Sequence, residues 1–128
     1  MNNPLLHVLT FGYARTPAPE TNLTVDVRWI PNPWHCNEFR DLSGLDAPVQ
    51  DWIFAQRGVA VWFEALLDVL GPTVAAAETR GEPLVTVAFG CQGGHDRSVA
   101  VALRLANAFQ RAGSPAHVQH LSFVRGSR

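Results

Sequence analysis

The stretch LVTVAFGCQGGHDRSVAVALRLANAFQRAGSPAHVQHL, residues 84–121, decides the fold of this chain. Its apolar start, residues 84–89, is typical of a strand covered on both faces. A helix is predicted over residues 97–112, ended by Gly-Ser-Pro, and a last strand over residues 116–121. A strand, a helix and a strand in that order form a βαβ unit with parallel strands. The stretch therefore predicts an α/β fold with a ligand crevice at the carboxyl ends of its strands.

Two more strands are expected before this unit, at residues 5–11 and 24–30. In the second strand, the alternation of side chains puts Asp26 and Arg28 on one side of the sheet, where they can form an ion pair. With the βαβ unit, these strands predict a small, mostly parallel sheet of about four strands.

Helices that pack on this sheet are expected at two further places. An Asp-Ala-Pro cap opens a short helix over residues 46–54. Apolar residues then recur at helical spacing over residues 58–79, with an expected interruption at Gly71-Pro72. After the last strand, residues 123–128 are expected to form a loose tail.

Length and composition favour one soluble domain over residues 1–128. With 128 residues and 47% hydrophobic content, the chain can bury one core. No stretch approaches the roughly 18–20 uninterrupted apolar residues of a membrane span, and a signal peptide is not apparent, so we expect a cytoplasmic protein. Cys36 and Cys91 are too few for a disulfide framework and are expected to be reduced.

Charge is distributed unevenly, although the net charge is only −1. Residues 1–96 carry five Arg and eleven Asp or Glu, whereas residues 97–128 carry five Arg and no acid. Three of these Arg follow one another at seven-residue steps on the last helix and so form one stripe. This stripe is either a solvated helix face or a track that contacts nucleic acid. The candidates for RNA contact are Arg104, Arg111, His117 and Arg125.

The glycine-rich segment GCQGGHDRS, residues 90–98, is the strongest functional signal. Its glycines let successive backbone N–H groups point inward, and the following helix adds the positive end of its dipole. Arg97 adds a two-pronged guanidinium, whereas Asp96 would repel an anion at 4 Å by about 1–4 kcal/mol. The segment predicts a phosphate or carboxylate site. Its candidate residues are Cys91, Gln92, Gly93, Gly94, His95, Arg97 and Ser98.

The same segment also has the Cys-x5-Arg-Ser pattern of cysteine-dependent phosphatases. In that alternative, Cys91 is the nucleophile, Arg97 holds the phosphoryl group and either Asp26 or Asp46 protonates the leaving oxygen. Against it, Gly90 stands where the protein tyrosine phosphatases usually have His. A metal site and a cofactor are not expected, because the His and Cys residues lack the close pairwise spacing of metal ligands.

Three separated blocks resemble the C-terminal domain of the RapZ family of RNase adaptor proteins, over about residues 5–121. The blocks are DVRWIPNP at residues 26–33, LSGLDAPV at 42–49 and GCQGGHDRSV at 90–99. The resemblance implies a regulatory, non-catalytic domain that binds a phosphorylated small molecule, such as an amino-sugar phosphate. It also implies a small RNA that the domain presents to an endoribonuclease. A nucleotide is the alternative ligand, and apolar Trp and Val side chains favour a homo-oligomer.

The chain departs from the family pattern at several positions. Asp96 stands where the family usually has His before the Arg of the loop, and His95 precedes it. After Pro-Asn-Pro the family usually has His and then Trp, whereas here Trp34 precedes His35. The N-terminal P-loop domain of full-length members is not expected, and the tail is poor in basic residues. The remaining candidates for ligand contact are Asp26, Asn32 and His35.

Overall fold

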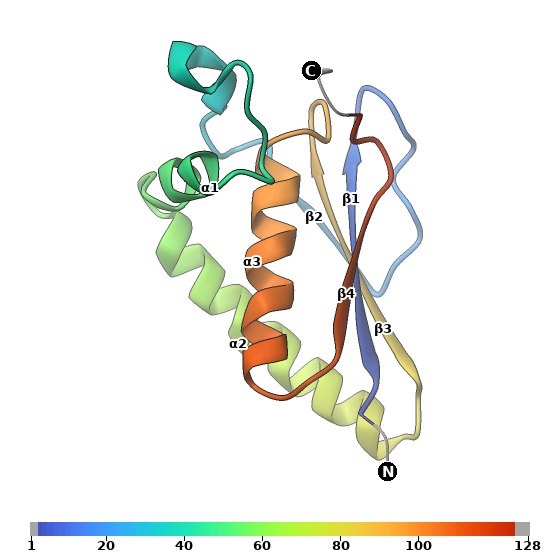
Figure 1. Cartoon of the computed structure of the whole chain (residues 1–128). Coiled ribbons are helices and arrows are strands. Elements are labelled where there is room, and N and C mark those ends of the chain that lie inside the picture. The colour runs from blue at the N-terminus through green and yellow to red at the C-terminus, as the bar shows by residue number, and fades with distance from the viewer. Residues whose placement is uncertain (1–2, 125–128) are drawn as a thin grey trace.

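The fold is a parallel sheet that carries helices on one face (Figure 1), as described by a computed structural model of residues 3–124. Its four strands within these residues are β1 (Leu5–Gly12), β2 (Leu23–Asp26), β3 (Leu84–Cys91) and β4 (Ala116–His120). The strand order is β2-β3-β1-β4, and every neighbouring pair is parallel. This arrangement confirms the predicted α/β fold.

Three α-helices and two short 3-10 helices connect the strands in the described part of the chain. The α-helices are α1 (Ala47–Phe54), α2 (Val59–Thr79) and α3 (Arg97–Arg111). The 3-10 helices are η1 (Pro33–His35) and η2 (Asn37–Phe39). Alternate residues of β1 and β3, such as Leu6, Val8 and Val87, are fully buried between the sheet and the helices. The opposite sheet face buries a smaller cluster of Leu9, Phe11 and Ala88, against which Tyr13 packs.

The strand predicted over residues 24–30 is shorter than expected, because β2 ends at Asp26. Val27 N–H still donates to the Gly90 carbonyl at 2.8 Å, but Ile30 N–H then donates to the Val27 carbonyl at 3.2 Å and closes a turn. This turn buries Val27 and Ile30, so these residues are apolar because they belong to the core and not because they form a strand. The predicted ion pair between Asp26 and Arg28 is confirmed, at 2.8 Å.

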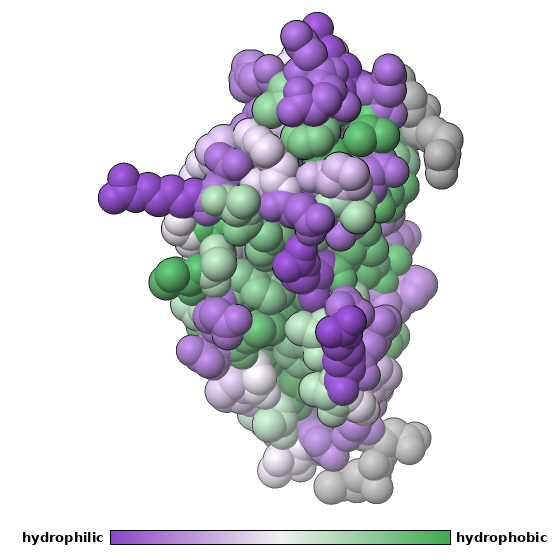
Figure 2. Space-filling view, turned by 60° about the vertical axis from the view of Figure 1, so that its left-hand side comes forward, coloured by the Kyte–Doolittle hydropathy of each residue, from purple (hydrophilic) through white to green (hydrophobic). Residues whose placement is uncertain are grey.

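The expected interruption of α2 is wrong, since the helix continues through Pro72. Pro72 is exposed, while a buried stripe that includes Leu66, Leu70 and Val74 runs past it without a break. By length and hydropathy, α2 could also cross a membrane. Because its buried stripe belongs to the main core, it is a core helix of this domain. Figure 2 shows the side on which α1 and α2 lie, where apolar surface is interspersed with polar side chains.

Of the loose tail expected over residues 123–128, the structure describes Phe123 and Val124, and Phe123 is held by packing. Ser122 is buried, and the Phe123 ring stacks on the His95 ring with their centroids 5.1 Å apart. The C-terminal segment therefore packs against the glycine-rich loop. Arg125, an RNA-contact candidate, lies outside the described residues.

Candidate functional site

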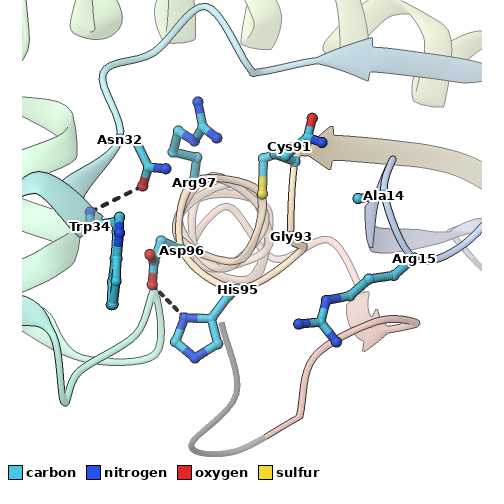
Figure 3. A pocket seen from close by; sticks show the side chains of 10 residues that line it. Ala14, Arg15, Asn32, Trp34, Cys91, Gly93, His95, Asp96 and Arg97 are labelled. Carbon is cyan, nitrogen blue, oxygen red and sulfur yellow. Dashed lines mark hydrogen bonds and ion pairs between the residues drawn. The ribbon is translucent and has the colours of Figure 1, made fainter.

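A pocket of about 420 Å³ lies at the carboxyl edge of the sheet, in front of the N-terminus of α3 (Figure 3). It is lined by Ala14, Arg15, Asn32, Trp34, Cys91, Gln92, Gly93, His95, Asp96 and Arg97. Six of these are candidates from the sequence: Asn32, Cys91, Gln92, Gly93, His95 and Arg97. The pocket thus lies where a βαβ unit favours a ligand.

The glycines of the loop permit a close approach between the ends of β1 and β3. Gly94 has a φ of +70°, which favours glycine. A Cβ atom on Gly12 would lie only 2.7 Å from the backbone nitrogen of Gly94, so a side chain there would push the loop away. A Cβ atom on Gly93, in contrast, would meet nothing within 4 Å, because this residue borders the open pocket.

Asp96 and His95 form a buried pair at the start of α3. Asp96 is the N-cap residue of α3, and its Oδ1 lies 2.7 Å from Nδ1 of His95. Both side chains are more than nine-tenths buried.

Arg97 connects α3 to the turn that follows β2. Its Nη1 donates to the carbonyl of Arg28 at 2.9 Å and to that of Ile30 at 3.0 Å. The partners of this nitrogen are thus backbone carbonyls, not carboxylates. The guanidinium of Arg28, which hydrogen-bonds Asp26, holds the pKa of Asp26 below its ordinary value, and the charge of Arg97 adds to this shift.

The position of the candidate acids does not favour the phosphatase chemistry. The Cys91 thiol donates to Oγ of Ser98 at 3.2 Å, and both side chains are buried. The Ser98 hydroxyl can equally donate to a thiolate, so this contact fits either form of Cys91. Neither Asp26 nor Asp46, the candidate acids of that alternative, is among the described residues that line the pocket.

Four predicted ligand residues do not line the pocket in the described part of the chain: Asp26, His35, Gly94 and Ser98. His35 is exposed on η1, while its neighbour Trp34 lines the pocket. Sequence reasoning also left out Ala14 and Arg15. Their place just beyond the carboxyl end of the first strand was the signal that could have found them.

Two of the RNA-contact candidates, Arg104 and His117, do not share one surface. The Arg104 guanidinium lies over the Phe54 ring, 4.1 Å from its centroid, and 3.9 Å from Asp51. His117 instead stacks with His7, with ring centroids 5.8 Å apart. Since its neighbour Val118 packs against the main core, His117 faces away from α3. No group of three or more possible metal ligands occurs in residues 3–124.

Known proteins resemble this chain over nearly its whole length. The family model of the RapZ C-terminal domain matches residues 4–123. A nucleotide-binding protein of Thermobifida fusca is 35% identical over 93% of this chain and 40% of its own length. The nucleotide-binding protein jk1004 of Corynebacterium jeikeium is 30% identical over 94% of this chain and 41% of its own length. The chain thus spans about 40% of these relatives, and it belongs to the RapZ C-terminal domain family.

Proposed function

We propose that this domain binds a small phosphorylated metabolite, an amino-sugar phosphate or a nucleotide, in the pocket at the N-terminus of α3. The observation that carries the proposal is the junction of the glycine loop with the first turn of α3. The first N–H groups of a helix have no carbonyl one turn earlier, and the helix dipole adds about half a positive charge there. Such an end is suited to a phosphate group.

The size and lining of the pocket favour a metabolite over an inorganic ion. Its volume of about 420 Å³ lies in the range of about 300–1,000 Å³ that is typical of small-molecule sites. Trp34 offers a flat face to a sugar ring or a base, and Asn32 and Asp96 offer polar groups to hydroxyls or an amine. The relatives are named nucleotide-binding proteins, which keeps a nucleotide as the second ligand hypothesis.

We further propose that the domain acts as a cytoplasmic, homo-oligomeric adaptor that presents a small RNA to an endoribonuclease. Membership of the RapZ family, whose members are RNase adaptors, supports this role. On α3, Arg111 is exposed and Arg104 is half-buried, so both remain candidates for RNA contact.

A thermal-shift panel of glucosamine 6-phosphate, glucose 6-phosphate, AMP and inorganic phosphate tests metabolite binding. Gly93→Leu is designed to fill the pocket, because the space beside Gly93 is open. Gly71→Leu is the matched control, since the space beside this exposed glycine of α2 is also open. We expect one phosphorylated compound to raise the Tm of the wild type and of Gly71→Leu by a few degrees, and to leave Gly93→Leu unchanged.

Two results would contradict this proposal. One is the absence of a shift with every compound, and the other is an equal shift in Gly93→Leu. The same samples are assayed for released phosphate. Release that is lost in Cys91→Ser would instead establish the cysteine-phosphatase alternative.

A further inference from the structure

We infer that Arg15, on the loop between β1 and β2, is the side chain that contacts the anionic group of the ligand, and that Arg97 positions the pocket. The inference rests on the proposed function, because it concerns the same pocket. Figure 3 shows the Arg15 side chain extending toward the pocket from the side opposite Trp34. The specificity of the site would then depend on a residue outside the glycine loop.

The turn that carries Arg15 is hydrogen-bonded to the glycine loop itself. Tyr13 N–H donates to the Cys91 carbonyl at 2.9 Å, and Ala14 N–H donates to the Gln92 carbonyl at 3.0 Å. These bonds extend the contact between β1 and β3 past the last paired residues, Gly12 and Cys91. The N–H of Arg15 then donates to the Gly12 carbonyl at 2.9 Å, which folds the chain back at the rim of the pocket.

Contacts from the C-terminal segment fix the other side of this turn. The buried hydroxyl of Ser122 accepts from Gly12 N–H at 2.9 Å and forms a hydrogen bond of 2.6 Å with Oγ1 of Thr16. Arg15 therefore lies between two residues, Ala14 and Thr16, that are both held by hydrogen bonds. Arg15 itself is exposed, so its long side chain extends toward solvent from a backbone position that hydrogen bonds fix.

Arg97 is placed for a different task. It is only 7% exposed, and its Nη1 donates to two backbone carbonyls of the turn after β2. Using that nitrogen for a ligand would leave a buried carbonyl without its donor, which is unfavourable. Of the two Arg residues that line the pocket, Arg15 is the exposed one, so its guanidinium is the one that an anion entering from solvent meets first.

The carboxylate of Asp96 in the pocket wall is a further reason for a cation on the opposite rim. Asp96 places a carboxylate in the wall, next to His95 at 2.7 Å. An anion that binds at the start of α3 meets this negative charge, and a guanidinium on the opposite rim offsets it. Without Arg15, the positive groups that could offset the Asp96 carboxylate would be the N-terminus of α3 and the buried Arg97.

Isothermal titration of the full chain with glucosamine 6-phosphate, AMP and inorganic phosphate tests the inference. We expect Arg15→Ala to weaken the Kd of the bound phosphorylated probe by about 10- to 100-fold, and to reduce the salt dependence of that Kd. Arg15→Lys should restore part of the affinity, because it keeps the charge but loses the planar fork. Arg57→Ala removes another exposed Arg, just after α1, and should bind like the wild type.

Melting of the unliganded variants separates the two roles. Arg15→Ala should melt like the wild type, whereas Arg97→Ala should melt at a lower temperature and also bind less well. If Arg15→Ala binds the probe as tightly as the wild type does, the inference is wrong and the proposed function stands. If the wild type binds none of the probes, the proposed function and the inference both fail.

Discussion

Gly44 and Gly71 show how the surroundings of a residue decide what a single methyl group would do. A Cβ atom on Gly44 would clash with the Asp96 carbonyl oxygen and lie 2.8 Å from the Ala100 nitrogen, at the first turn of α3. A Cβ atom on Gly71, on the exposed side of α2, would meet nothing within 4 Å apart from its neighbours in the helix, which include Pro72. Gly44 permits close packing between its loop and the start of α3. Gly71 fills no such tight space and only increases the conformational freedom of the unfolded chain.

We therefore expect the same substitution to have different effects at these positions. Gly44→Ala should lower the free energy of unfolding by about 1–3 kcal/mol through overpacking. Gly71→Ala should change it by less than about 1 kcal/mol, because the usual advantage of Ala over Gly within a helix is offset by contact of the new Cβ atom with the ring of Pro72. Urea unfolding followed by circular dichroism measures both. Equal losses in the two variants would contradict the packing argument for Gly44.

His120 gives the stability a defined pH dependence. Its Nδ1 lies 2.7 Å from Oγ1 of Thr10, and burial lowers the pKa of His120 below its ordinary value. The unfolded chain, in which the pKa of His is about 6.5, binds this proton more readily than the folded chain. The stability that His120 contributes is therefore present above this pH and is lost as the pH falls toward the folded pKa.

This loss can be measured as the change in Tm between neutral and mildly acidic buffer. We expect the Tm of the wild type to fall over that interval, and the fall to be smaller in His120→Gln. His117→Gln carries the same substitution at an exposed position of β4 and is the control. An unchanged pH dependence in His120→Gln would mean that other groups cause the fall.

Among the elements, the sequence was most informative where local pattern and burial agree. The apolar run of β3, the glycine loop and the amphipathic α3 follow one another within one βαβ unit, and all were predicted. The end of β2 was not predicted, because the apolar residues Val27 and Ile30 are buried by a turn. The continuity of α2 through Pro72 depends on its buried stripe, which local propensity does not reveal.

Arg97 couples two of these elements, and we expect its loss to be costly. Arg97→Ala removes the donor to the carbonyls of Arg28 and Ile30, which should lower the free energy of unfolding by about 1–3 kcal/mol. Arg104→Ala, on the same helix, removes a long ion pair with Asp51 and a ring contact, and should cost about 1 kcal/mol or less. Chemical unfolding of both variants tests this order, and equal losses would contradict it.

For the whole molecule, the pocket is assembled from three separate parts of the chain, and this limits prediction. The glycine loop was evident from one segment. Arg15 and Trp34 enter the pocket from other loops, and contacts between distant residues, such as that of Gly12 with Ser122, hold the first of these loops in place. Nothing in the local sequence around Arg15 records its hydrogen-bonded neighbours at the end of β3. Only the assembled sheet brings them together.

The distribution of Arg over the whole molecule leads to a prediction about RNA. Arg97 is buried, and His117 faces away from α3, so Arg104 and Arg111 are the predicted RNA contacts that the described part of α3 retains. If both contact phosphates of a small stem-loop RNA, the double variant Arg104→Ala/Arg111→Ala should reduce the slope of log K against log salt by about 2. Filter binding over a range of salt concentrations measures that slope, with Arg57→Ala as the control. An unchanged slope in the double variant would mean that neither Arg104 nor Arg111 contacts a phosphate. Arg125 would then be the remaining Arg candidate for RNA contact, since the cations of α3 would contribute nothing to RNA affinity.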